Sequence, residues 1–182
     1  MKKLVLAAIA ALGFSANAQA ADWSGFYLGV LGGFSAGGIP DCGSDCNEVW
    51  PGIAKVAGYN WDTGDMIFGI DEMVVVTFVP EDFASEQVTK ISWQKMGRFG
   101  FEITDNIMIY GAAGGGISAV WDADDFDSLW YGAVAAGVEV ALNENLSWRT
   151  HLQYSRSQMF SDCEGCFVHV TTLATGVTWS LN

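Results

Sequence analysis

The stretch LSWRTHLQYS, residues 146–155, decides the fold because apolar and polar side chains alternate along its whole length. Successive side chains of a β-strand point to opposite faces of a sheet, so the alternation separates two surfaces. One surface holds Leu146, Trp148, Thr150, Leu152 and Tyr154; the other holds Ser147, Arg149, His151, Gln153 and Ser155. The pattern predicts a strand with one apolar and one polar face.

Seven other segments of similar length and patterning share the chain with it. The predicted strands are 23–34, 51–61, 66–78, 88–103, 107–121, 129–142, 146–158 and 168–181. Short and long connections alternate strictly between them. The short ones, 62–65, 104–106 and 143–145, carry the Asp, Asn and Gly of tight turns, and the long ones are 35–50, 79–87, 122–128 and 159–167. All short connections therefore lie at one end, the turn rim, and all long ones at the other, the loop rim. This layout predicts an all-β fold, an eight-stranded antiparallel up-and-down β-barrel.

The distribution of apolar residues places this barrel in a membrane. After the N-terminal segment, no uninterrupted apolar run reaches the roughly 18 residues that a spanning helix needs. A chain that crosses lipid without helices must use a closed sheet. Aromatic residues fall near both predicted rims: Trp121, Trp130, Tyr154 and Phe167 at the loop rim, and Trp23, Phe101, Trp148 and Trp179 at the turn rim. Two aromatic girdles with short periplasmic turns and long extracellular loops are typical of transmembrane barrels.

The N-terminus has the layout of a secretory signal. Lys2 and Lys3 precede an apolar run, and Ala18-Gln19-Ala20 has the small-x-small pattern of a cleavage site. We therefore expect a signal peptide over residues 1–20 and one barrel domain over residues 21–182. The expected location is the cell outer membrane.

The charge balance argues against nucleic acid as a partner. The 182 residues carry 8 Lys+Arg against 21 Asp+Glu, a formal net charge of −13, whereas phosphate binding needs clustered cations. The acids gather in the long connections: Asp41, Asp45, Glu48, Glu81, Asp82, Glu86, Asp122, Asp124, Asp125, Asp127, Asp162 and Glu164. These clusters indicate a solvated loop surface, and cation binding is the alternative.

Three charged residues disturb the apolar faces. Lys95 lies between Trp93 and Phe99 on the apolar parity of its strand, and Glu72 does the same in the strand before it. A charge at the bilayer midplane is costly, so we expect a β-bulge that resets the parity. Lys55 leaves the facing of the strand 51–61 open.

The polar face predicts a charged interior. An eight-stranded barrel is just wide enough to be filled by side chains, so charges inside it must pair. The candidate network residues are Asp71, Lys90, Arg98, Glu102, Glu139, Arg149 and His151. Such a network would plug the barrel and argues against a general pore.

Several motifs resemble one family. The start of the predicted mature chain, DWSGFYLG over residues 22–29, resembles the opening of the small outer-membrane β-barrel proteins of Gram-negative bacteria, whose best-known members are immunogenic surface proteins. GYNW at 58–61 with FGID at 68–71 resembles the family's second hairpin. TDNIMIYG at 104–111 and LNENLS at 142–147 resemble its later turns.

This resemblance implies an eight-stranded outer-membrane barrel with roles in envelope integrity, surface interaction and, in some members, haem binding. It offers no catalytic residue to carry over, and we expect no cofactor and no metal. The expected partners are outer-membrane lipid and lipopolysaccharide, the barrel assembly machinery, and an unidentified surface ligand or host partner. The chain departs from the family at its end, where Leu181 and Asn182 replace the usual terminal aromatic residue.

The four cysteines form the most individual feature of the loops. Cys42 and Cys46 lie in the first long connection, and Cys163 and Cys166 in the last. An even count in an exported chain favours disulfides, either within each loop or across the two loops. A tetrahedral zinc site is the remaining alternative. For haem, His169 near the loop rim is the one candidate axial ligand.

The sequence therefore predicts a non-enzymatic barrel with a structural or surface-interaction role. One alternative is a surface ligand-binding barrel for haem or a cation. Another is a lipid A modifying barrel enzyme, although no Ser, His and acid constellation supports it. A secreted lipocalin-type carrier is the last, and it would reverse the facing, with apolar residues inside.

Overall fold

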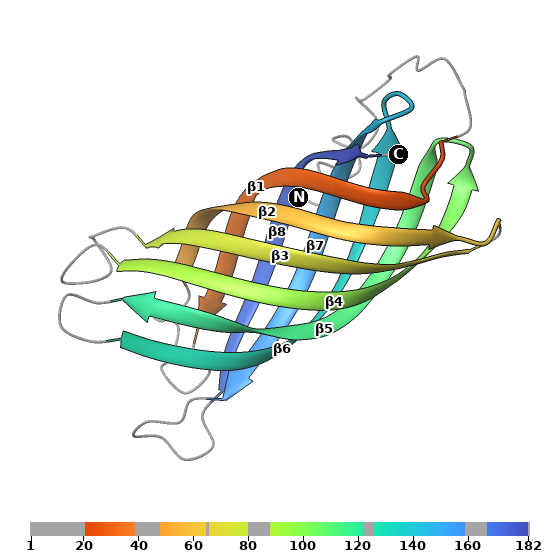
Figure 1. Ribbon diagram of the computed structural model, residues 1–182. Coiled ribbons are helices and arrows are strands. Elements are labelled where there is room, and N and C mark those ends of the chain that lie inside the picture. The colour runs from red at the N-terminus through yellow and green to blue at the C-terminus, as the bar shows by residue number, and fades with distance from the viewer. Residues whose placement is uncertain are drawn as a thin grey trace, which may run out of the picture.

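The computed structural model is a closed barrel of eight antiparallel strands (Figure 1). It describes residues 21–38, 48–64, 66–79, 88–121, 126–158 and 167–181. The strands are β1 (Gly25–Gly38), β2 (Glu48–Asp62), β3 (Ile67–Val79), β4 (Val88–Thr104), β5 (Ile107–Trp121), β6 (Phe126–Ala141), β7 (Leu146–Gln158) and β8 (Phe167–Ser180). Among these residues no helix is long and apolar enough to cross a membrane. The predicted fold is confirmed, and the strand ends differ from the prediction by a few residues.

The barrel closes where β1 pairs with β8. Glycines make this seam tight: a Cβ atom on Gly176 would lie 2.8 Å from the Cα atom of Leu31, and one on Gly33 would lie 2.7 Å from the Cα atom of Ala174. Real Cβ atoms do not approach a backbone so closely, so the seam requires residues without a side chain. Gly64 serves a different purpose, because its φ of 94° suits the turn between β2 and β3.

The two faces of the barrel have the polarity expected for a membrane protein. On β7, Leu152 and Tyr154 are exposed on the outside, whereas Arg149, His151 and Gln153 are buried inside. Exposed apolar side chains cover the outside of the other strands in the same way. The lipocalin-type alternative is wrong, because it required polar residues outside, whereas the outer face carries exposed apolar side chains.

Four of the eight residues predicted for the aromatic girdles are exposed on the outside, while Trp148 and Phe167 are half-buried. Trp130 and Tyr154 are exposed near the loop rim, and Phe101 and Trp179 near the turn rim. Trp23 is instead 6% exposed and packs inside the barrel. Its assignment to the outer girdle is wrong: Trp23 has the same parity as the inward-facing Tyr27 and Leu31, so the alternation of β1, continued to residue 23, places it inside.

The expected bulge at Lys95 and Glu72 is also wrong. The pairing of β3 with β4 is continuous from Ile67 to Val79, and Glu72 stands directly opposite Lys95 on the outer face. Their side chains form a 3.6 Å ion pair and are 46% and 57% exposed. Trp93 completes the contact, because its Nε1 donates a 2.7 Å hydrogen bond to Glu72. The charges therefore neutralise each other on the lipid-facing surface.

The structure also shows which way Lys55 faces, which the sequence left open. Lys55 is exposed on the outer face, while its neighbours Ala54 and Val56 are buried inside. The one irregularity in the pairing of β4 with β5 lies between Glu102 and Thr104, close to the turn rim.

Several sequence predictions fall outside the described residues. These are the signal peptide over residues 1–20, the four cysteines, and the acids of the long connections apart from Glu48 and Asp127. The side chains of those two acids, and that of Trp121, are likewise not described.

Candidate functional site in the barrel lumen

The lumen is layered along its length, and an apolar cluster closes it near the turn rim. Trp23 lies there against Ile67, Met108 and Ala141, all of them buried. The chain just before Trp23 is fixed by a 2.8 Å hydrogen bond from the backbone N–H of Ala21 to the carbonyl of Asp105 in a turn. The segment that leads into β1 therefore fills this end of the barrel.

The next layer consists of four buried charges from four different strands. Arg98 Nη1 lies 3.1 Å from Glu139 Oε1 and 3.7 Å from Asp71 Oδ1. Arg149 Nε lies 3.4 Å from the same Glu139 oxygen, and its Nη2 pairs with Asp71 Oδ2. Two acids and two bases balance in sign. The charges thus compensate one another in a place where an isolated ion would be very costly.

Two tyrosines tie this charged layer together. Tyr27 donates its hydroxyl hydrogen to Asp71 and accepts a 3.2 Å hydrogen bond from Arg98. The Tyr110 ring lies 4.2 Å from Arg98 Cζ and 4.8 Å from that of Arg149, both cation–π contacts. Its hydroxyl accepts a 2.7 Å hydrogen bond from Arg149 Nε. The predicted interior network does not include these two tyrosines, although the inward parity of both residues indicates them.

A neutral layer of amides lies above the charges. Gln94 and Gln153 bond reciprocally, with Nε2 to Oε1 distances of 2.8 and 3.1 Å. Tyr131 donates a 3.0 Å hydrogen bond to Gln94. His151 connects the layers, since its Nε2 lies 3.2 Å from Gln153 Oε1 and its Nδ1 lies 2.9 Å from the Tyr110 hydroxyl. We call this layer the amide floor.

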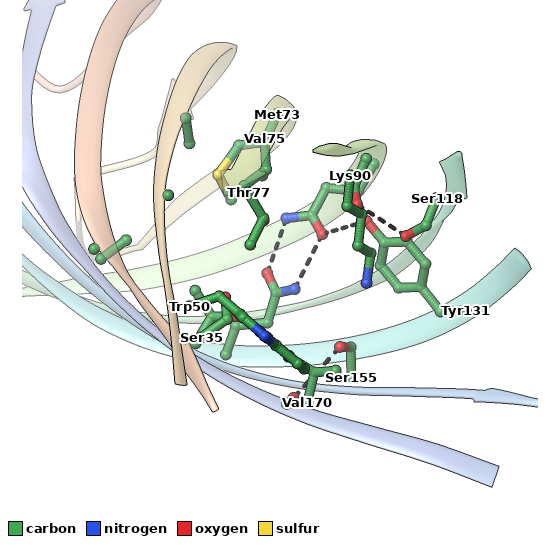
Figure 2. A pocket seen from close by; sticks show the side chains of 18 of the residues that line it. Ser35, Trp50, Met73, Val75, Thr77, Lys90, Ser118, Tyr131, Ser155 and Val170 are labelled. Atoms are coloured by element: carbon green, nitrogen blue, oxygen red, sulfur yellow. Dashed lines mark hydrogen bonds between the residues drawn. The ribbon is translucent and has the colours of Figure 1, made fainter. Parts of the chain in front are cut away.

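Between the amide floor and the loop rim lies an internal cavity of about 220 Å³ (Figure 2). Its wall combines apolar side chains such as Leu31 and Val75 with many hydroxyl groups. Ser92 and Ser118 pair across β4 and β5 at 2.8 Å, and Ser35 pairs with Thr172 at the same distance across the β1–β8 seam. Lys90 also lines the cavity, and Figure 2 shows its side chain extending into it.

The residues predicted as an interior network occupy three places. Asp71, Arg98, Glu139 and Arg149 lie together in the charged layer, with His151 joined to them through Tyr110. Lys90 lies apart in the cavity and makes no ion pair with any described residue. Glu102 also lies apart, on the exposed end of β4.

Two observations on the described residues of the lumen bear on bond chemistry and metal binding. Both ring nitrogens of His151 are engaged, by Tyr110 and Gln153, and neither of these partners is a serine. Among the described residues, no three His, Cys, Asp or Glu side chains could hold a metal ion together. His169, the haem candidate, is not in the cavity wall; its Nδ1 hydrogen-bonds the hydroxyl of the outward-facing Tyr154.

Comparison with known proteins agrees with this geometry. The model of the outer membrane protein beta-barrel domain matches residues 6–180. A 22 kDa outer membrane protein of Rhizobium leguminosarum bv. viciae is 31% identical over 146 residues, which are 76% of this chain and 66% of that protein. A 31 kDa outer-membrane immunogenic protein of Brucella melitensis is 26% identical, over 85% of this chain and 87% of that protein.

Among solved structures, Neisserial surface protein A has the same fold. Its TM-score is 0.65 at 17% sequence identity, and the match covers 87% of this chain and 98% of that one. An identity this low bears on the fold alone.

Proposed function

Because the chain belongs to the outer membrane protein beta-barrel domain family and is an outer-membrane protein, we propose that it is a non-enzymatic barrel that anchors acidic loops at the cell surface. The observation that carries this proposal is the filled lumen. The charged layer joins four strands across the interior, and the cluster around Trp23 fills the barrel below it. A barrel filled in this way is suited to hold its rims rigidly and unsuited to conduct solutes.

The sequence of the long connections supports display as the task of the loop rim. Residues 39–47, 80–87, 122–125 and 159–166 each contain Asp or Glu and contain no Lys or Arg. Cross-linking of these loops by Cys42, Cys46, Cys163 and Cys166 belongs to the same proposal. An acidic, solvated surface favours cationic partners and repels anionic ones.

The barrel itself would contact lipid and lipopolysaccharide through its outer face. Exposed apolar side chains line that face on all the strands, as a bilayer requires. Insertion would need the barrel assembly machinery, which would meet β8, whose last residues are Trp179 and Ser180. Envelope integrity is thus the contribution of the barrel, and surface interaction that of the loops.

Two engineered forms of the full chain test which rim of the barrel faces the outside of the cell. An epitope is inserted into the connection 80–87 in one form and into the turn 143–145 in the other. We expect antibody to label the first on intact cells and the second only after the outer membrane is permeabilised. Labelling of the turn epitope on intact cells would contradict the proposed orientation.

The display role needs a separate comparison in cells that lack the protein. A loop-trimmed form, with 80–87 and 122–125 replaced by short turns, should restore detergent resistance as well as the full chain does but lose binding of a cationic peptide such as polylysine. Equal polylysine binding by both forms would refute display. Loss of acyl chains from lipid A in vesicles containing the full chain, followed by mass spectrometry, would establish the enzyme alternative instead.

A further inference from the structure

Among the charged residues of the described lumen, one cation, Lys90, makes no ion pair. Asp71 and Glu139 are balanced by Arg98 and Arg149 within the charged layer. The amide floor separates that layer from the cavity above, where Lys90 lies on β4. Lys90 therefore has no negatively charged partner in the charged layer.

The wall of the cavity has a composition opposite to that of the whole chain. The protein carries 21 Asp+Glu, yet none of the residues described as lining the cavity is an acid, and Lys90 is the one Lys or Arg among them. The described side chains of this wall thus carry a positive net charge, which favours an anion over a cation beside them.

Hydroxyl groups beside Lys90 can complete the recognition of an anion. Ser92 follows Lys90 on the same face of β4, and its hydroxyl bonds that of Ser118 on β5 at 2.8 Å. The two hydroxyls carry two hydrogens and their shared bond uses one, so the second is available to an acceptor in the cavity. Figure 2 shows Lys90, Ser118 and Tyr131 on the same wall.

The size and lining of the cavity limit what such an anion can be. About 220 Å³ is smaller than the roughly 300–1,000 Å³ of sites for drug-sized molecules. The remaining wall is largely aliphatic, with Leu31, Val75 and Val170 among its residues. A ligand that fits would have one anionic group and a short apolar body.

We propose that the cavity above the amide floor binds a small organic carboxylate, with Lys90 as its anchoring cation. The carboxylate is held by Lys90 and the free hydroxyl hydrogen of the Ser92–Ser118 pair, and its apolar body packs on the aliphatic wall. The site stands apart from the loop display proposed above, because it uses residues of the strands alone.

The lysine content of the chain offers a direct test. After residue 20 the only lysines are Lys55, Lys90 and Lys95, and the first and last are exposed on the outer face. Reductive ¹³C-methylation keeps their charge and gives NMR signals from these three lysines and from the α-amino group of the barrel in lipid nanodiscs, each lysine signal being assigned by replacing that lysine. Butyrate is titrated as the probe, and neutral butyramide is its matched control. We expect butyrate to shift the Lys90 signal alone and butyramide to shift none.

Equilibrium dialysis with radiolabelled butyrate tests the unmodified protein. Lys90→Met should bind butyrate at least about tenfold more weakly, the loss expected for a charge-assisted hydrogen bond. Lys55→Met, which removes the same charge from the outer face, should bind like the unaltered chain. Heat-dependent gel mobility establishes that each variant is folded.

Three results would overturn the proposal: no butyrate binding by the unaltered chain, equal binding of butyramide, or unchanged butyrate binding by Lys90→Met. The comparison of butyrate with butyramide uses the unaltered protein, so it decides the matter even if Lys90→Met does not fold.

Discussion

Replacing Asp71 by Asn removes the acid on which the charged layer depends. Asp71 is 1% exposed and pairs with Arg149 and, at 3.7 Å, with Arg98, while Tyr27 donates its hydroxyl to the same carboxylate. Asn has nearly the same shape, so the packing is preserved. The change deletes one negative charge and leaves Glu139 alone to balance two arginines.

The expected cost follows from what the arginines lose. Arg149 is fully buried, and its Nη1 has no hydrogen-bond partner among the described residues, so no further acceptor is at hand to replace Asp71. Removing one partner of a buried ion pair typically costs about 3–5 kcal/mol, because the other charge stays buried and uncompensated. We expect Asp71→Asn to lower the free energy of unfolding by about that amount.

The assay is equilibrium unfolding by urea in lipid vesicles, followed by tryptophan fluorescence and by heat-dependent gel mobility. Glu144→Gln is the matched control, because it makes the same change of charge on an exposed turn residue and should alter stability little. Arg149→Met should restore part of the stability when combined with Asp71→Asn, since residues of one network do not act additively. A loss below about 1 kcal/mol for Asp71→Asn alone would refute the network as the basis of barrel stability.

Three further predictions concern other parts of the barrel. Trp23→Ala should lower the free energy of unfolding in the same assay by about 3–5 kcal/mol, because it empties the cluster at the turn rim. An unchanged midpoint of urea unfolding would mean that Trp23 is exposed on the surface instead. Gly176→Ala should reduce the fraction of protein that folds into vesicles, since its Cβ would meet the Leu31 backbone at the seam, whereas Gly132→Ala, with open space around it, should fold normally; equal yields would show that the seam is looser than described. Glu72→Ala should lower the folded fraction by leaving Lys95 unpaired in lipid, and the added change Lys95→Met should restore it; no loss in Glu72→Ala would mean that the outer ion pair is dispensable.

The strands were predictable from the sequence because their alternation is regular and a barrel gives each face a different solvent. Residues 146–155 show this most clearly, since every side chain of that segment is placed by its parity. Trp23 was assigned to the wrong side because only its nearness to the turn rim was considered, although it has the parity of the inward-facing Tyr27 and Leu31. Parity also does not show which residue a side chain contacts on the neighbouring strand. The ion pair of Glu72 with Lys95 was therefore not expected, although the two residues stand directly opposite on adjacent strands.

The charged character of the lumen was predictable from the sequence, but the arrangement of its side chains was not. Inward parity identified the charged side chains, but it does not give their height along the barrel axis. Lys90 and Arg98 share a face of β4, yet one lies in the cavity and the other in the charged layer, with Gln94 between them. The roles of Tyr27 and Tyr110 depend on contacts between strands far apart in the sequence, which a reading strand by strand does not supply.

The most direct test of the central claim, a membrane barrel whose lumen is filled, is the ionic conductance of the purified protein in a planar lipid bilayer. Insertion is established on the same preparation by heat-dependent gel mobility. We predict that membranes containing the folded barrel show no stable open-channel steps above those of the bare bilayer. Regular conductance steps that scale with salt concentration would contradict the account, because they would require a continuous water-filled path through the charged layer.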